Sequence, residues 1–169
     1  MLGAALDYAD RAEMLIEFLD ALIELFPTYE AVYFQSSGKM FTAEKIRSSE
    51  SLRNNRFIYS AVNVRFFNIQ GTNDMIVDTV GMSILGLPDL QYHFHGFDPN
   101  DVVNHAYNML SYIFDNDCSI KNGDTIDGLE NGKMSMEVQW KCQFEESLIQ
   151  PVRDVIDVCM NEFASGQRE

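Results

Sequence analysis

The chain of 169 residues contains 46% hydrophobic and 12% aromatic residues, which is typical of one globular domain with a sizeable core over residues 1–169. Its formal charge of −14 repels phosphate backbones and anionic lipid surfaces, so we expect no binding to nucleic acid or to a membrane surface. A membrane span is not expected either, because Glu17, Asp20 and Glu24 interrupt the most apolar segment.

The first part of the chain carries helix and strand signals in turn. Apolar residues at helical spacing predict an amphipathic helix over residues 7–26, and Pro27 ends it. Its expected core stripe is Leu15, Phe18, Leu19, Leu22, Leu25 and Phe26. The run 31–34 predicts a strand, and residues 42–53 predict a second helix with Thr42 as N-cap.

The middle of the chain predicts a hairpin, a strand and a long helix. β-Branched and aromatic residues indicate strands over residues 58–69 and 75–82, joined by turn-forming residues. Alternating apolar and polar residues predict a half-buried strand over 89–95. Asp98 as N-cap and Pro99 in the first turn predict a helix to residue 114, with His105 beside its apolar stripe.

The last part predicts three strands, over residues 124–129, 136–145 and 155–159, with a turn at Asn131-Gly132. The predicted fold class is therefore α+β, a mostly antiparallel sheet with two long helices packed on one face. Because a helix opens the chain almost at once, the sequence leaves open whether an amino-terminal segment is lacking.

The amino terminus lacks the basic and apolar regions of a secretory signal, so we expect a cytoplasmic protein. The three cysteines, Cys118, Cys142 and Cys159, are odd in number and widely spaced. This pattern favours reduced thiols over a disulfide framework.

Arg65 and Asp78 are charged residues within strands that are otherwise apolar, so they are the first candidate site residues. If the hairpin loop is residues 70–73, Ile69 pairs with Asp74 and Arg65 lies opposite Asp78. A structural ion pair is one interpretation of such a pair. The other is an anion-binding arginine held by a carboxylate.

A second candidate group follows the polar face of the strand over residues 89–95, where Asp89, Gln91, His93 and His95 alternate with apolar residues. His93 and His95 form an HxH pair, which makes them weak candidates for a metal site. No further ligand has a diagnostic spacing, and hydrogen-bonded histidines explain the pattern equally. We therefore assign no metal and no cofactor.

The third candidate group lies in the segment WKCQFEESLIQPVR, residues 140–153. Its polar members are Lys141, Gln143, Glu145, Glu146, Ser147 and Arg153. Paired carboxylates perform general acid/base chemistry when burial or crowding raises one pKa, but a solvated strand face produces the same alternation. The sequence contains no GxSxG, P-loop or GxGxxG motif.

Several of these segments resemble a family of bacterial proteins classified as domain of unknown function 4261. The resemblance is carried by VNVRFF (62–67), DTVGMSILGLPDLQYHF (78–94), GDTIDG (123–128) and WKCQFEESLIQPVRDVID (140–157). Together these stretches cover most of residues 62–157. The resemblance implies no reaction and no catalytic residues, because the family has no established activity. It also implies a further segment before the first helix.

Two functions remain from the sequence. The first is a non-catalytic interaction or ligand-binding domain that contacts a basic protein partner or a small polar ligand, as the acidic charge suggests. The alternative is a metal- or water-dependent hydrolase that uses Asp78, Asp89, His93, Glu145 and Glu146. The two differ in whether Arg65 and these acidic and histidine residues share one concave pocket.

Overall fold

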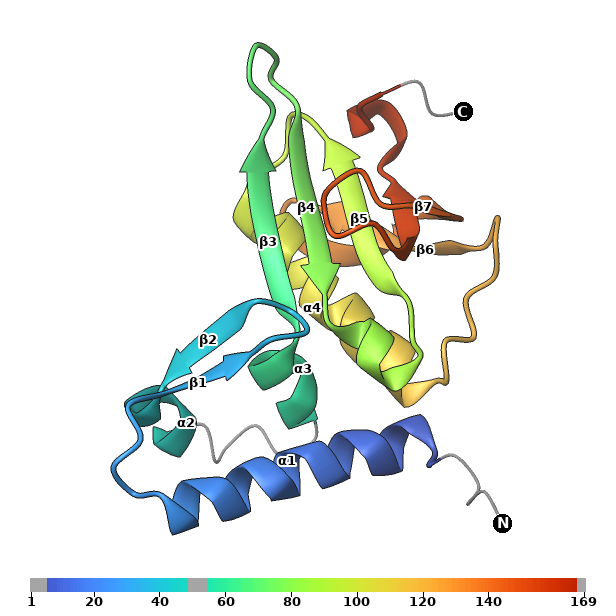
Figure 1. Cartoon of the computed structure of the whole chain (residues 1–169). Helices are drawn as coiled ribbons and strands as arrows, with labels where there is room; N and C mark the ends of the chain where they lie inside the picture. The colour runs from blue at the N-terminus through green and yellow to red at the C-terminus, as the bar shows by residue number, and fades with distance from the viewer. Residues whose placement is uncertain (1–5, 49–54, 167–169) are drawn as a thin grey trace.

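A computed structural model describes residues 6–48 and 55–166 (Figure 1). Its elements in chain order are α1 (Tyr8–Leu25), β1 (Ala31–Phe34), β2 (Lys39–Thr42), α2 (Ala43–Ser48), α3 (Arg56–Ala61), β3 (Asn63–Asn68), β4 (Met75–Val80), η3 (Met82–Leu85), β5 (Asp89–Phe94), α4 (Pro99–Asp115), β6 (Thr125–Glu130), β7 (Lys133–Glu146), β8 (Asp154–Cys159) and η4 (Asn161–Phe163). The predicted α+β class is confirmed.

A six-stranded sheet in the order β3-β4-β5-β8-β7-β6 forms the centre of the fold. Neighbouring strands are antiparallel except β5 and β8, which run parallel in the middle of the sheet. Between β5 and its parallel neighbour β8, the chain forms α4 and then the β6–β7 hairpin, whose two strands belong to the same sheet. β1 and β2 form a separate two-stranded sheet beside the start of β3 (Figure 1).

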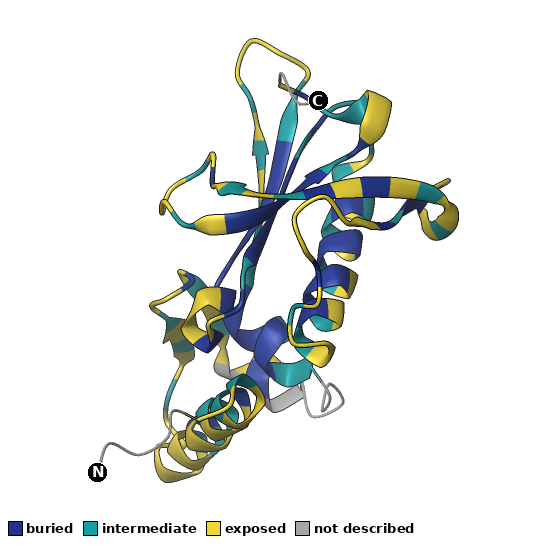
Figure 2. Ribbon diagram, turned by 90° about the vertical axis from the view of Figure 1, so that its right-hand side faces the viewer, coloured by how far each residue is buried: buried dark blue, intermediate teal, exposed yellow. Residues whose placement is uncertain are grey.

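Helix α4 covers one face of the six-stranded sheet (Figure 1). Its N-terminus is capped as predicted, because the carboxylate of Asp98 accepts the backbone N–H of Asn100 at 2.8 Å. Its buried side chains are Val102, His105, Ala106, Met109, Leu110 and Ile113. They pack against the apolar face of the sheet, in the dark blue interior of Figure 2.

The prediction that His105 lies beside the apolar stripe of this helix was wrong. His105 is 1% exposed, and both ring nitrogens have partners, the hydroxyl of Tyr92 at 3.0 Å and the carbonyl oxygen of Asp127 at 2.8 Å. A polar side chain enters a core at low cost when its hydrogen bonds are satisfied. The pattern of apolar residues along the helix does not show that these hydrogen-bond partners are present.

Helix α1 packs mainly against α3 and η3, at one end of the sheet. A bidentate ion pair between Arg56 and Asp20 joins α1 to α3, with N–O distances of 2.5 and 2.6 Å. The predicted core stripe of this helix was wrong in part. Leu19 is buried, but Phe18 and Leu25 are 62% and 71% exposed. The apolar surface of α1 is wider than the area that the described residues cover.

Three other predictions need correction. Residues 58–61 belong to α3 and not to a strand, because a short apolar run has the same pattern in a buried helix. β2 was not predicted, and η3 begins where a strand was expected to continue. The helix expected over residues 42–53 is observed as α2; residues 49–53 lie outside the described part. Its predicted cap is present, since the Thr42 hydroxyl accepts the N–H of Lys45 at 3.4 Å.

The buried His105 makes the stability of the fold depend on pH. Burial lowers its pKa below the ordinary 6.5, so below that pH the unfolded chain binds a proton that the folded chain does not. We expect the free energy of unfolding to fall as pH decreases below about 6.5, down to the folded-state pKa. Urea unfolding of the wild type and of His105→Gln at several pH values tests this. Equal pH slopes in the two proteins would contradict the assignment.

Candidate functional site

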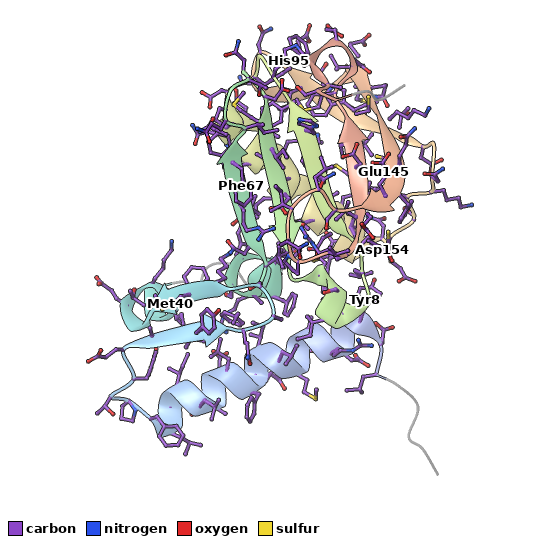
Figure 3. All side chains as sticks on the ribbon, turned by 45° about the horizontal axis from the view of Figure 1, so that its top comes forward. Tyr8, Met40, Phe67, His95, Glu145 and Asp154 are labelled. Carbon is purple, nitrogen blue, oxygen red and sulfur yellow. The ribbon has the colours of Figure 1, made fainter. Side chains whose placement is uncertain are left out.

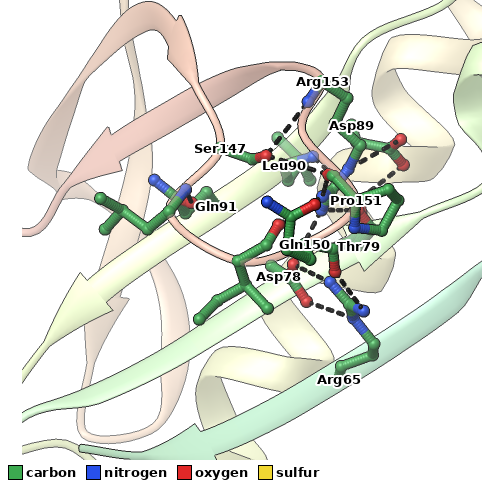
Figure 4. A network of polar contacts seen from close by, with 12 residues as sticks. Arg65, Asp78, Thr79, Asp89, Leu90, Gln91, Ser147, Gln150, Pro151 and Arg153 are labelled. Carbon is green, nitrogen blue, oxygen red and sulfur yellow. Dashed lines mark hydrogen bonds and ion pairs between the residues drawn. The ribbon is translucent and has the colours of Figure 1, made fainter.

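A row of polar side chains crosses the sheet on the face opposite α4. The strand register places one member on each of five neighbouring strands: Arg65 on β3, Asp78 on β4, Gln91 on β5, Asp157 on β8 and Gln143 on β7. Successive side chains of a strand point to opposite faces, so this row lies back to back with the apolar residues that α4 covers. The loop of residues 147–153 passes over the row (Figure 4).

The carboxylate of Asp78, the second member of the row, is fully buried and is bound by two arginines. Arg65 donates from Nε to Oδ1 at 2.8 Å and from Nη2 to Oδ2 at 2.5 Å. Arg153 donates from Nη2 to Oδ2 at 2.7 Å. The predicted register is confirmed, because Ile69 and Asp74 close the turn and Arg65 lies opposite Asp78.

Arg153 connects this carboxylate to a second one. Its Nε lies 3.4 Å from Oδ2 of Asp89, and its Nη2 also donates to the backbone oxygen of Thr79 at 2.7 Å. Its Nη1 donates to the backbone oxygen of Pro151 at 2.7 Å. Two guanidinium groups therefore face two carboxylates, and their charges balance.

Asp89 also holds the start of η3. Its carboxylate accepts the N–H groups of Met82 at 3.2 Å and Gly81 at 3.4 Å, and the hydroxyl of Thr79 at 3.1 Å. Burial raises the pKa of this carboxyl, and these hydrogen bonds and Arg153 oppose the rise. Gly81 has a φ of +136°, and a Cβ there would lie 3.0 Å from the oxygen of Ala61. This tight turn therefore requires glycine.

The covering loop is fastened to the row by hydrogen bonds (Figure 4). Arg65 Nη1 donates to the backbone oxygen of Gln150 at 2.9 Å. The side chain of Gln91 accepts the N–H of Leu148 at 2.7 Å and donates to Asp157 at 3.0 Å. Within the loop, the Ser147 hydroxyl donates to the oxygen of Pro151 at 3.1 Å. These hydrogen bonds hold the loop against the row of polar side chains.

Residues 78–159 match the model of a family described as Domain of unknown function (DUF4261). This part of the chain is similar to that family. The resemblance predicted from the sequence is therefore confirmed over these residues. No curated protein and no solved structure matches the chain.

The matched DUF4261 segment begins at Asp78 and contains its partner Arg153, as well as Asp89 and the covering loop. Arg65, the other partner of Asp78, precedes the segment on β3. The ion pair between Arg65 and Asp78 therefore connects the matched segment to the strand that comes before it.

Other predicted residues of the matched segment lie beside the network. Glu145, Glu146 and Arg153 line a cavity of about 630 Å³, together with parts of η3, the following turn and Asp154. Gln143 lies next to Asp157 by register, and the side chain of Lys141 is exposed at the edge of the β7–β8 pair.

The two histidines of the HxH pair lie at the other end of β5, with Asp74 and Ser165. The Ser165 hydroxyl donates to Asp74 at 2.8 Å and lies 3.1 Å from Nδ1 of His95. His95 is labelled in Figure 3. His93 Nε2 is 3.9 Å from the other oxygen of Asp74. In a catalytic triad the serine proton goes to histidine, whereas here it points to the carboxylate. These contacts therefore hold the β3–β4 turn, the end of β5 and the residues near the C-terminus together.

The structure thus brings Arg65, Asp78 and Asp89 together, places Glu145 in an adjoining cavity, and puts His93 elsewhere. Across residues 6–48 and 55–166, no three His, Cys, Asp or Glu side chains are arranged to hold a metal ion. In the same residues, no helix is long and apolar enough to cross a membrane.

The sequence did not indicate the backbone acceptors that complete the network. The oxygens of Thr79, Gln150 and Pro151 each receive a guanidinium hydrogen bond. A backbone oxygen carries no sequence signal, and only the fold brings it to a side chain. The glycine pair of GMSILG was a usable signal, because Gly81 and Gly86 both have positive φ at the two ends of η3.

Asp78→Asn tests how much the network contributes to the free energy of unfolding. The amide leaves two guanidinium groups near a neutral partner, and breaking a buried ion pair costs roughly 3–5 kcal/mol. We expect that loss in the free energy of unfolding, measured by urea denaturation. Glu146→Gln is the matched control, because it removes the same charge from an exposed side chain at the end of β7. A difference below about 1 kcal/mol between the two variants would sink the prediction.

Proposed function

We propose that this chain is a non-catalytic protein-interaction domain that binds a basic amphipathic helix along α1. The observation that supports this is an exposed apolar stripe on α1, made of Met14, Phe18, Leu22, Leu25 and Phe26. Successive members are three or four residues apart or adjacent, so all of them lie on one side of the helix. Large exposed apolar patches commonly mark interaction sites.

The faces of α1 differ in chemistry. One face, with Ala12 and Leu19, is buried against the chain. The stripe defined above lies next to it and is open to solvent (Figure 2). Beyond the stripe, Glu13, Glu17 and Glu24 form an exposed acidic edge. A partner that covers the stripe therefore meets carboxylates along its border.

Charge complementarity identifies the chemistry of the partner. A helix with an apolar face and lysine or arginine at its margins would bury the stripe and pair with the acidic edge. The net charge of −14 would also draw such a partner in, and would oppose contact between two copies of this acidic chain. A basic protein segment is thus favoured over self-association.

The polar network supports a non-catalytic role. Asp78 and Asp89, two of the acids of the alternative hydrolase, are each held by arginine, and His93 lies with Asp74 at the far end of β5. A general base needs an accessible position next to substrate. We also propose a bacterial, cytoplasmic origin, to which the three free cysteines are suited.

The double variant Phe18→Asp, Leu25→Asp tests the docking stripe. A fluorescent Leu/Lys helical peptide serves as the probe, and fluorescence anisotropy at low salt gives its affinity. We expect saturable binding to the wild type and at least about tenfold weaker binding to the double variant, because the apolar contact is lost. Both side chains are exposed, so the thermal midpoint should stay near that of the wild type.

Met136→Asp is the matched control, because Met136 is apolar and 81% exposed but lies on β7, far from α1 in the fold. It should bind the peptide like the wild type. A Leu/Glu peptide should bind much more weakly than the Leu/Lys peptide. If sedimentation shows a dimer that the double variant abolishes, the occupant of the stripe is a second copy and the proposal is wrong.

A further inference from the structure

A further cavity lies where the β1–β2 hairpin meets α3, β3 and α4. Its volume is about 490 Å³, within the range of small-ligand sites. Its lining residues are Lys39, Met40, Phe41, Lys45, Tyr59 and Tyr107, with Ser60 and Asn63 among its polar members. Met40 marks the position of this hairpin in Figure 3.

Lys39 is a partly buried cation at this cavity. Its Nζ donates to the backbone oxygens of Tyr59 and Val62, both at 2.6 Å, which are carbonyl groups at the C-terminal end of α3. These bonds stabilise the helix end, where carbonyl groups lack helical partners. An ammonium group has three donors, so one remains for another acceptor. In the described part of the chain, no carboxylate forms an ion pair with Lys39.

Lys45 adds a second positive charge at the same place. The ammonium groups of Lys39 and Lys45 lie 4.9 and 5.2 Å from the centroid of the Phe41 ring. Burial and the charge of Lys45 lower the pKa of Lys39 to about 8, so Lys39 is still mostly protonated at pH 7. Two like charges that share a cavity repel each other, and an anion between them would remove that repulsion.

The rest of the cavity wall is aromatic. The rings of Tyr59 and Tyr107 are stacked, with centroids 5.1 Å apart and planes 19° apart. Together with Phe41 they offer flat apolar surface beside the two ammonium groups. A planar ring and an anionic group within one ligand would match both parts of this lining.

We propose that this cavity binds a small phosphate monoester that carries an aromatic ring, with the phosphate at Lys39 and Lys45 and the ring against Tyr59 and Tyr107. A phosphate monoester carries a charge of about −1.5 to −2 at pH 7, which matches two ammonium groups. Lysine binds phosphate as a point charge and does not need the paired geometry of arginine. This site is separate from the stripe on α1 and does not depend on the proposed protein partner.

Phenyl phosphate is the probe for this site, titrated at low salt and followed by calorimetry and by the NMR signals of lysine Cε. We expect saturable binding, a shift of the Lys39 signal, and a rise in the pKa of Lys39 as the anion is bound. Lys45→Gln should weaken binding by roughly tenfold or more, since a charge-assisted contact is lost. The side chain of Lys45 is exposed, so this variant should fold normally.

Lys133→Gln is the matched control, because it removes the same charge from an exposed lysine on the β6–β7 hairpin. It should bind phenyl phosphate like the wild type. Inorganic phosphate and phenol should each bind more weakly than phenyl phosphate, because each lacks half of the proposed contacts. The absence of saturable binding, or equal weakening by Lys45→Gln and Lys133→Gln, would overturn the proposal.

Discussion

The buried carboxylate of Asp78 is the constraint on which the centre of this fold depends. A charge without solvent is stable in a protein only when opposite charges and hydrogen bonds compensate it. Here the compensation comes from Arg65, thirteen residues earlier on the neighbouring strand, and from Arg153, at the end of the loop that precedes β8. One carboxylate therefore joins three segments of the chain. Through Arg153 the same network reaches Asp89, and through Asp89 it holds the start of η3.

The half of this network that lies within one hairpin could be predicted from the sequence. Turn-forming residues fixed the loop, the loop fixed the register, and the register put Arg65 opposite Asp78. Strand alternation likewise put Asp89 and Gln91 on one face. The contribution of Arg153 could not be predicted in this way, because its position depends on how a loop folds back over the sheet. Glu145 was assigned to the same neighbourhood and lies in the adjoining cavity.

The errors in the helices have related causes. Periodicity shows which residues are apolar, but it does not show how much of an apolar face the rest of the chain covers. For this reason it placed Phe18 and Leu25 in a core and left His105 outside one. His105 is buried because the hydroxyl of Tyr92 and the carbonyl oxygen of Asp127 form hydrogen bonds with its ring nitrogens. Phe18 is exposed because no described element covers that side of α1. Both outcomes depend on tertiary contacts between residues far apart in the sequence. The local pattern of apolar residues does not show such contacts.

The chain has a single tryptophan, so its intrinsic tryptophan fluorescence comes from one place in the fold. Trp140 is buried where β6, β7 and α4 meet, with the His105 ring centroid 4.9 Å from its own and the backbone of Gly128 directly against the indole. Its intrinsic fluorescence therefore reports on the junction of α4 with the β6–β7 hairpin and is insensitive to α1, which packs at the other end of the fold. Circular dichroism records α1 as well. Fluorescence and dichroism unfolding curves will separate whenever α1 detaches before the sheet opens.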